Sequence, residues 1–544
     1  MRLSLISTTD LHGRIEALPL LAGYVGRLRE LRERDGGVML LDAGDMFQGT
    51  LESNLDEGQV VFDAYRALGY DAVALGNHEF DYGPVGDSTS GNPFGALEAR
   101  LSEASFPVLA ANLVWQATRA QPDWPKLAPS ALLEVASVRV GVIGALTEET
   151  PHIVMPAYFR GLGVVSMSER VKLEAARLRK RGARLVVLLA HAGGHCSQFD
   201  DPMNLTSCKH DAELLELLRE LPAGTVDLAF GGHTHQAMAH VVSGVPVAQA
   251  WAYGRGFARI DAQVPASPSA RPKLLVYPPQ ALCKNDGEAP PCEPHEYEGA
   301  TITASPAIAR LLRGAQQRAL EVRSRPVGVT VRAEVTRSFE RESDLGNLLA
   351  DLLVEAVPGS QIALLNGGGI RADLPAGELR YGQLYEVMPF DNRVTILMLS
   401  GRELRAVIAR HLGRAEHGIL SVGGMTVRAR CVNAELQVEL RKDGKLIDDA
   451  ARLSVVVSDY LATGGDGLFD GLALSERMDL RAELTLRDAF AQSLSRRREI
   501  APAADASFSA SRQRMRLPSP RPVRCAADVS GSLGSDPRAR GETT

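Results

Sequence analysis

Several features are scarce or missing in this chain of 544 residues, and each absence excludes a class of protein. No apolar run approaches the roughly 20 residues that a helix needs to cross a bilayer, so we expect no transmembrane segment. No signal peptide is visible, because residues 1–9 already have the pattern of a strand. The 60 basic and 66 acidic residues give a net charge of −6, with no basic block that would suit nucleic acid. We therefore expect no nucleic-acid partner.

Cysteine is also scarce, but the placement of the six residues is informative. They form two close pairs and two isolated residues: Cys196 with Cys208, Cys283 with Cys292, and Cys431 and Cys525 alone. Close pairs in turn-rich loops predict local disulfides, with four unrelated thiols or a metal clip as alternatives. Disulfides persist in oxidising compartments, so we expect a periplasmic or secreted protein whose signal is trimmed or precedes this start.

The chain is too long for one hydrophobic core, and its composition changes along its length. Residues 1–265 alternate short apolar runs with helical stretches such as Leu18–Arg34, which is typical of an α/β sandwich. A second α/β domain is predicted at 326–515 from the same alternation. The other predicted segments are an irregular Pro-rich insert at 266–302, a linker helix at 303–325 and a disordered tail at 516–544.

Polar side chains follow five apolar runs of the first domain, at the points where strands are predicted to end. These residues are Asp10 and His12, Asp45, Asn77 with His78 and Asp81, His191, and His233 with His235. Ligands of open α/β sheets bind beyond the carboxyl ends of the strands, so we expect these side chains to converge. Alone, each would be a surface histidine or a turn-forming aspartate. Five such coincidences together favour a common site.

Seven of these residues are candidate metal ligands, and none is a cysteine: Asp10, His12, Asp45, Asn77, His191, His233 and His235. Oxygen and imidazole donors suit Zn²⁺, Mn²⁺, Co²⁺ or Fe. Seven donors are too many for one tetrahedral ion, whereas two divalent ions sharing a carboxylate account for them. Two ions roughly 3.5–4 Å apart are the usual device for holding a phosphoryl group and activating a water. His152, His195, His210 and His240 belong to none of these strand-end groups, so we expect no metal role for them. Gln48 is expected to hold the Asp45 loop.

The blocks that carry these residues resemble those of a known family. In order they are TTDLHGR, GDMFQGT, GNHEFD, LLAHAGG and GGHTH, and together they resemble the 5′-nucleotidase family of binuclear metallophosphoesterases, which includes periplasmic UDP-sugar hydrolase. The resemblance implies a calcineurin-like α/β sandwich followed by a C-terminal 5′-nucleotidase α/β domain. It implies a first ion on Asp10, His12, Asp45 and His235, and a second on Asp45, Asn77, His191 and His233. It also implies that His78, paired with Asp81, stabilises charge on the phosphate.

The second domain carries three further blocks: NGGGIR, MPFDN and SDYLATGGDG. The resemblance implies that Phe390 and Tyr460 stack on the base, while Asp466, Asn366 and Arg371 contact ribose, base or phosphate. Stacking tolerates different bases, so a broad nucleotide range would follow. From the residues alone, two alternatives remain. NGGGIR could be a glycine-rich turn with a solvated arginine, and Phe390 and Tyr460 could be ordinary core aromatics. One position departs from the family, because Phe339 stands where an arginine is expected, which leaves the substrate open.

These observations lead to one predicted activity and two alternatives. We expect a metal-dependent hydrolase in which a hydroxide bridging two divalent ions attacks nucleoside 5′-monophosphates, releasing nucleoside and phosphate. The small-molecule substrate could instead be a UDP-sugar, a 2′,3′-cyclic nucleotide or a thiosulfonate within the same family. In a different class, the chain could be a surface protein that binds nucleotide or metal without turnover. No oligomeric state follows from the sequence.

Overall fold

The computed structural model describes residues 1–86, 91–267, 270–284, 292–414, 417–474, 476–502 and 505–525. The chain divides into two compact units. The first unit comprises residues 1–327 together with 380–390 and 463–467, and the second comprises 328–379, 391–462 and 468–544. Within the described ranges, no helix combines the length and the apolar character that crossing a membrane requires.

The first unit is built on two mixed sheets. One has the order β15 (Lys273–Val276), β14 (Gly256–Gln263), β1 (Arg2–Thr8), β2 (Gly36–Asp42), β3 (Ala72–Ala74), β4 (Val108–Leu109) and β6 (Leu127–Ala128), with β16 (Gln280–Ala281) also paired to β14. The other has the order β12 (Ala237–Val242), β13 (Val245–Ala250), β11 (Leu228–Gly231), β10 (Leu185–His191), β8 (Val138–Leu146) and β7 (Ser130–Val135). Strands β1 to β4 are mutually parallel, as are β8, β10, β11 and β13.

Hydrophobic side chains fill the space between the two sheets and both outer faces. Leu3 and Leu5 of β1 join the central core cluster with Val187 and Leu189 of β10, whereas Ile6 points to the outer face of its sheet. Successive strand residues point to opposite faces, so a continuous apolar run is what a strand buried on both sides requires. The predicted α/β sandwich is therefore confirmed, and its strands are apolar because both of their faces are covered.

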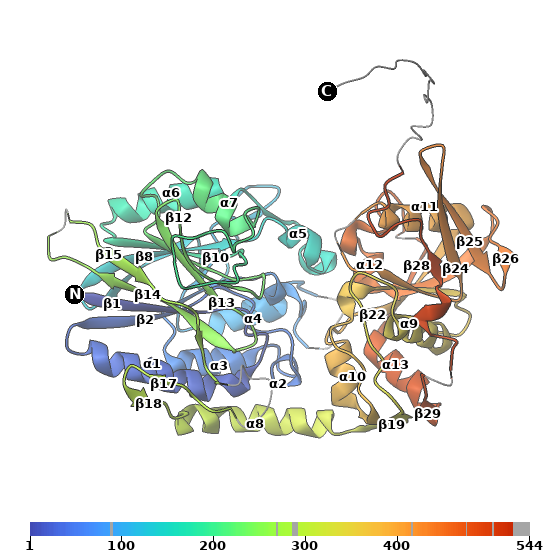
Figure 1. The fold of residues 1–544 in the computed structure, drawn as a ribbon, viewed down its shortest axis with the longest axis horizontal. Helices are drawn as coiled ribbons and strands as arrows, with labels where there is room; N and C mark the ends of the chain where they lie inside the picture. Colours follow the sequence, from blue (N-terminus) through green and yellow to red (C-terminus); the bar gives the residue numbers. More distant parts are fainter. Residues whose placement is uncertain are drawn as a thin grey trace, which may run out of the picture. The chain divides into compact units, whose positions relative to one another are not determined.

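Helices cover the two outer faces, as Figure 1 shows. On the side of the first sheet they are α1 (Leu18–Arg32), α3 (Gln59–Leu68) and α8 (Pro306–Arg323), and on the other side α6 (Met167–Lys180) and α7 (Glu213–Glu220). Ser305 caps α8 by accepting the N–H of Ile308, and Pro306 occupies its first turn, where a missing N–H costs nothing. Shorter elements are α2 (Leu51–Asn54), α4 (Gly95–Glu103), α5 (Thr150–Ile153), β5 (Leu113–Trp115), β9 (Leu162–Val164), β17 (Glu296–Tyr297) and β18 (Ala300–Thr301).

The prediction that 266–302 forms an irregular excursion or hairpin outside the core is wrong only in that parts of it belong to the core. Strand β15 within it pairs antiparallel with β14, where Ile260 lies opposite Val276, and extends the first sheet. Leu282 and Ile302 are buried in the core cluster beneath α1. The Pro-rich composition concealed these short pairings, because an edge strand needs only a few apolar contacts on one face. Residues 268–269 and 285–291 lie outside the described part of the chain.

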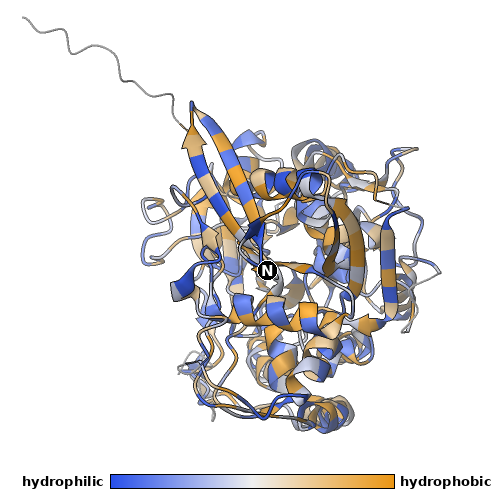
Figure 2. Cartoon of the chain, turned by 90° about the vertical axis from the view of Figure 1, so that its right-hand side faces the viewer, coloured by the Kyte–Doolittle hydropathy of each residue, from blue (hydrophilic) through white to orange (hydrophobic). Residues whose placement is uncertain are grey.

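The second unit contains its own sheets and helices. Its largest sheet has the order β23 (Leu420–Gly423), β20 (Ile362–Asn366), β27 (Arg452–Ser458), β22 (Arg393–Ser400) and β28 (Met478–Thr485). The helices include α9 (Asp344–Ala356), α11 (Gly401–Leu412), α12 (Asp459–Ala462) and α13 (Leu486–Ser495), and α10 (Tyr381–Val387) belongs to the first unit. Smaller sheets join β19 (Pro326–Val331) to β21 (Gly377–Arg380) and β29 (Glu499–Ile500), and β24 (Thr426–Val432) to β25 (Glu435–Lys442), β26 (Lys445–Leu446) and β30 (Met515–Arg516). Along the β24–β25 hairpin, hydrophilic and hydrophobic residues alternate (Figure 2), as expected for strands with one face covered.

The prediction of a disordered tail from residue 516 is wrong for residues 516–525. Met515 and Arg516 pair in parallel with Val427 and Arg428, and Val523 is buried in the core of the second unit. Cys525 forms a disulfide with Cys431, so neither cysteine stands alone. These two residues are 94 positions apart, a distance at which spacing gives no hint of pairing. Residues 526–544 lie outside the described part of the chain.

The two predicted local disulfides, Cys196–Cys208 and Cys283–Cys292, are confirmed. With the Cys431–Cys525 bond, all six cysteines are paired. Thiol titration of the denatured protein is therefore expected to find no free thiol without reductant, and six after reduction. Four or more free thiols in the unreduced protein would contradict the disulfide pairing.

Candidate metal centre

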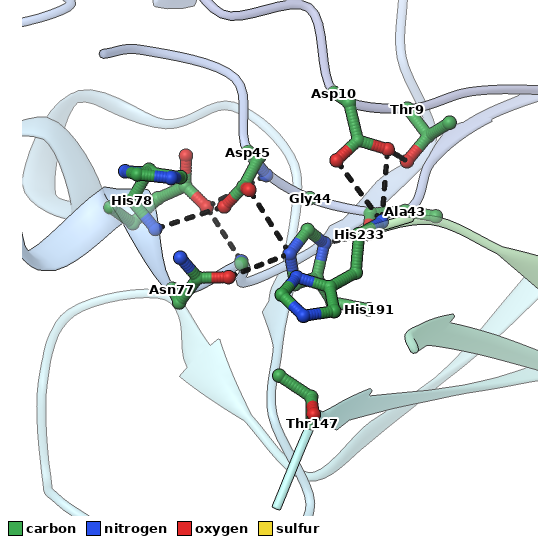
Figure 3. Close-up of polar contacts among 12 residues, drawn as sticks. Thr9, Asp10, Ala43, Gly44, Asp45, Asn77, His78, Thr147, His191 and His233 are labelled. Atoms are coloured by element: carbon green, nitrogen blue, oxygen red, sulfur yellow. Dashed lines mark hydrogen bonds and ion pairs between the residues drawn. The ribbon is translucent and has the colours of Figure 1, made fainter. Parts of the chain in front are cut away.

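The side chains that were expected to converge lie together at the carboxyl ends of the strands of the sandwich. Asp10 follows β1, Asp45 follows β2 and Asn77 follows β3, all from the first sheet. His191 ends β10 and His233 follows β11, both from the second sheet. Parallel strands bring their carboxyl ends to one edge of a sheet. Packing of the two sheets then places both edges at one site, where the side chains of Asp45, Asn77 and His191 point toward one another (Figure 3).

The backbone of five candidate ligands lies in the left-handed region that non-glycine residues rarely adopt. The positive φ angles are 49° at Asp10, 49° at His12, 58° at Asp45, 72° at His233 and 57° at His235. A non-glycine residue in this region of backbone conformation costs roughly 1–3 kcal/mol relative to an ordinary conformation. Such strain persists only where surrounding contacts impose it, and it clusters at functional sites. The observation therefore supports a functional role for these turns.

One group of donors gathers Asp10, His12 and His235. The Nε2 atom of His235 lies 3.5 Å from Oδ1 of Asp10 and 3.0 Å from Nε2 of His12. The three donor atoms all lie within 4.8 Å of one another. The Asp10 carboxylate is fixed by Thr9, whose hydroxyl donates to it at 2.5 Å, and by the backbone N–H of His233. This group has the size and composition of a metal site.

A second group gathers Asp45, His191 and His233, again with donor atoms within 4.8 Å of one another. Oδ2 of Asp45 lies 3.1 Å from Nε2 of His191, and Oδ1 of Asn77 lies 3.1 Å from the same nitrogen. The same Oδ2 atom of Asp45 is 3.8 Å from Nε2 of His12 in the first group. Asp45 therefore lies between the two groups, in the position of a shared ligand.

The orientation of two imidazoles shows which nitrogen faces the site. Nδ1 of His12 lies 2.8 Å from the backbone oxygen of Gln48, and Nδ1 of His191 lies 2.8 Å from that of Ala43. A carbonyl can only accept, so Nδ1 of each ring carries a proton and Nε2 is the nitrogen that faces the donor groups, where it offers a lone pair once it is deprotonated. Metal-ligating histidines are commonly held in this way. Gln48, predicted to hold the Asp45 loop, thus orients His12 through its backbone oxygen, while its side-chain amide donates to Pro389 O at 3.2 Å.

The electrostatics of the cluster point to a missing positive charge. Burial raises the pKa of Asp10 to about 8, although His191 opposes the rise. Burial lowers the pKa of His191, but the carboxylates of Asp45, Asp10 and Glu79 together outweigh this effect and raise it to about 10. Buried carboxylates such as these demand a positive charge nearby. Divalent ions meet that demand and displace these protons, so the donor set fits a metal centre.

Glu79 holds the loops that carry these ligands, and its role was not foreseen from the sequence. Its buried carboxylate accepts the backbone N–H groups of Asp45 at 3.0 Å, Met46 at 2.7 Å and Gly76 at 2.6 Å. Gly76 is required here, because a Cβ atom would lie 2.1 Å from Oδ1 of Asp45. The only available signal was an acidic residue inside the otherwise assigned motif GNHEFD.

His78 and Asp81 form the predicted pair at the rim of the cluster. Nδ1 of His78 lies 2.5 Å from Oδ2 of Asp81, and the backbone N–H of His78 donates to Oδ1 of Asp45 at 2.9 Å. The side chain of His78 is partly exposed, unlike that of His191. Its ring centroid lies 6.2 Å from that of Phe390, which belongs to the same unit. His78 is therefore oriented by Asp81 and accessible to a bound substrate.

The five predicted substrate residues are divided between the two units. Phe390 and Asp466 belong to the first, and Asn366, Arg371 and Tyr460 to the second. Within the second unit, Asn366 ends β20 and leads into the glycine turn, where Arg371 donates to Gly368 O at 3.4 Å. Phe339, at the expected arginine position, is 48% exposed, and its ring lies 3.9 Å from where a Cβ of Gly368 would be. Phe339, the residue that differs from the family pattern, therefore lies next to the glycine turn.

Two family models match the chain. The calcineurin-like phosphoesterase model matches residues 3–237, and the model of the 5′-nucleotidase C-terminal domain matches residues 325–473. The chain belongs to the 5′-nucleotidase family of metallophosphoesterases. Members of this family are phosphoesterase hydrolases, and the first match spans all seven candidate ligands of the centre.

Relatives of the 5′-nucleotidase family share about a quarter of the sequence. Protein UshA of Yersinia enterocolitica is 26% identical over 81% of this chain and 80% of its own length. The 5′-nucleotidase of Vibrio cholerae is 25% identical over 86% of this chain and 85% of its own length. Among solved structures, a 5′-nucleotidase precursor from Thermus thermophilus aligns with a TM-score of 0.70 at 24% identity, over 95% of this chain and 99% of that one. That last similarity shows the fold alone.

Proposed function

We propose that the protein is a metal-dependent phosphomonoesterase that hydrolyses nucleoside 5′-monophosphates to nucleoside and phosphate. The observation that carries the proposal is the pair of donor groups that share Asp45. The groups match two ions, with Asp10, His12, Asp45 and His235 holding one, and Asp45, Asn77, His191 and His233 holding the other. These residues do not select among Zn²⁺, Mn²⁺, Co²⁺ and Fe, because all four metals bind oxygen and imidazole ligands.

The chemistry divides between the ions and the side chains. Two divalent ions at such a site supply a nucleophile from water at neutral pH and neutralise charge on the phosphate oxygens. We assign to His78 a hydrogen bond to an equatorial phosphate oxygen, where negative charge develops during phosphoryl transfer. Asp81 holds the His78 ring by accepting a hydrogen bond from Nδ1, and Nε2 of the doubly protonated ring would be the donor to the phosphate. Asp10 and His191 are fully buried, so their donor atoms have little contact with bulk solvent.

The nucleotide part of the substrate is assigned to the C-terminal blocks. We propose that Phe390 and Tyr460 stack on the base, and that Asn366, Arg371 and Asp466 contact ribose, base or phosphate. The 6.2 Å centroid distance between Phe390 and His78 supports this assignment, because it places an aromatic ring beside the group that would contact phosphate.

The direct test is hydrolysis of a panel of substrates, followed as free phosphate for the phosphate monoesters and as the nucleoside monophosphate formed from UDP-glucose or 2′,3′-cyclic AMP. Metal-stripped protein would be given Mn²⁺, Zn²⁺, Co²⁺ or Mg²⁺ singly, with AMP, UMP, UDP-glucose, 2′,3′-cyclic AMP and p-nitrophenyl phosphate as substrates. We expect metal-dependent release that is fastest with the nucleoside monophosphates. Faster hydrolysis of UDP-glucose or of the cyclic nucleotide would replace the proposed substrate. No hydrolysis of any of the five substrates by protein with bound metal would favour a binding protein.

A substitution at Phe390 tests the base contact. Phe390→Ala is expected to raise KM for AMP by about 5- to 150-fold, the loss of roughly 1–3 kcal/mol of stacking. The KM for p-nitrophenyl phosphate, which has no nucleobase, serves as the control and should change much less. An unchanged KM for AMP would remove Phe390 from the substrate site.

The disulfides bear on where the protein acts. The three pairs join all six cysteines, and such bonds persist in oxidising compartments. We therefore propose a periplasmic or secreted location.

A further inference from the structure

Two segments that carry candidate ligands run side by side for several residues beyond the metal centre. One follows His191 and the other contains His233 and His235. The N–H of Gly232 donates to Ala192 O, and the N–H of Cys196 donates to Ala237 O, both at 3.2 Å. These two backbone bonds hold the segments at either end. Neither bond holds the residues between Gly232 and Ala237, which include His233 and His235.

A closed set of three hydrogen bonds supplies that connection. The side chain of Gln249 accepts the N–H of Gly194 through Oε1 at 3.2 Å and donates from Nε2 to the hydroxyl of Thr234 at 2.9 Å. The hydroxyl of Thr234 donates in turn to Gly194 O at 2.8 Å. Each donor in the set thus has an acceptor, and both backbone groups of Gly194 are engaged. The set joins the His191 segment to the residue between His233 and His235.

The packing around these bonds leaves little room for adjustment. Gln249 is 1% exposed on β13, the strand that lies between β11 and β12 in the sheet, beneath the loop that joins them. A Cβ atom at Gly193 would lie 2.2 Å from Gly232 O and 2.4 Å from Oγ1 of Thr234. A buried amide must be hydrogen-bonded, so loss of the Thr234 hydroxyl takes from Gln249 a partner that its buried side chain needs.

We propose that Gln249 and Thr234 are positioning residues that fix His233 and His235 relative to His191 and thereby set the affinity of the centre for its metal. The inference rests on the proposed function in that these imidazoles bind divalent ions. His233 and His235 both have a positive φ, so their backbone needs outside contacts to stay in place. Thr234 lies between them, and a shift of its backbone would move both rings. Neither positioning residue belongs to the donor groups of the centre.

Metal affinity tests this inference without any measurement of activity. Binding of Mn²⁺ or Co²⁺ to metal-stripped protein would be measured by competition with a chelator for the unchanged protein and three variants. Gln249→Met and Thr234→Val remove the bonds while preserving volume, and Thr234→Ser keeps the hydroxyl. We expect the Kd to rise by about 10–100-fold in the first two variants, as is typical for groups that orient metal ligands. Thr234→Ser should bind like the unchanged protein.

Two controls separate positioning from folding. Gln361→Met removes a glutamine that accepts the N–H of Ser454 at 3.0 Å in the second unit, and the Kd should not change. The metal-free Thr234→Val variant should still unfold cooperatively, with a Tm lowered only by the loss of the two hydrogen bonds of this hydroxyl. If Gln249→Met does not fold, the Thr234→Val and Thr234→Ser pair decides the question.

The outcomes distinguish this inference from the proposed function. An unchanged Kd in Thr234→Val, or an equal loss in Thr234→Ser, would overturn the positioning role. Metal binding by the unchanged protein without hydrolysis of any nucleotide would overturn the proposed function, while the comparison of Kd values would still test the positioning role.

Discussion

Asp45→Asn is expected to abolish metal-dependent phosphate release, with a larger loss than that of any other single substitution. Oδ2 of Asp45 faces His191 at 3.1 Å and His12 at 3.8 Å, so one carboxylate serves both donor groups. The amide keeps the size of the side chain but removes the negative charge that both groups share. Loss of one charge-stabilising group typically lowers kcat by about 10²–10³-fold. The loss here should exceed that range, because both ions depend on Asp45.

The measurement combines kcat/KM for AMP with metal content at equilibrium. Bound metal should fall together with activity, whereas the folded protein should persist, because the amide oxygen can still accept the N–H of His78. Asp71→Asn is the matched control, since Asp71 also accepts a backbone N–H, from Leu40 at 2.8 Å, but lies outside the cluster. Near-normal activity in Asp45→Asn would contradict a centre built on a shared carboxylate.

His78→Ala is expected to lower kcat by about 10²–10³-fold while leaving metal content unchanged. His78 is oriented by Asp81 and lies at the partly exposed rim of the cluster, so its proposed role is to stabilise charge on phosphate. An interaction made only in the transition state lowers kcat and kcat/KM to the same extent. KM for AMP should therefore remain nearly constant. Asp81→Asn should act in the same direction with a smaller effect, because the ring is retained but less well oriented.

His210→Ala provides the matched histidine control. His210 is exposed and lies outside the donor groups, and the substitution keeps its backbone oxygen, which accepts a hydrogen bond from Arg219 at 2.6 Å. Removal of this side chain should leave kcat and metal content unchanged. If His78→Ala lost metal as well as activity, His78 would be a ligand rather than a group that acts on the phosphate.

The sequence was sufficient for the fold class and for the residues of the candidate site. Apolar runs such as Leu185 to Leu189 predict strands buried on both faces, and the polar residue that follows each run marks its carboxyl end. The structure confirms the sandwich and brings Asp10, Asp45 and His191 together from three strands of two sheets. Local patterns suffice here because a strand and its ending are properties of a few neighbouring residues.

Pairings between distant segments escaped prediction from the sequence. The tail beyond residue 516 has the composition of a disordered segment, yet its described part pairs with β24 and is held by Cys525 to Cys431. Strand β15 arises in the same way inside a Pro-rich stretch. Each depends on a partner remote in sequence, so neither leaves a periodic signal of its own.

The chain by itself determined which side chains would form the centre, because the motifs fix residue types at the ends of buried strands. Only the tertiary structure decided how they are held. The carboxylate of Glu79, the carbonyl of Ala43 and the amide of Gln249 reach the ligand loops from other segments. The left-handed turns at Asp10 and His233 likewise depend on those contacts. Hydrogen bonds of this kind form between groups that folding brings within about 3 Å, a proximity that sequence spacing does not encode.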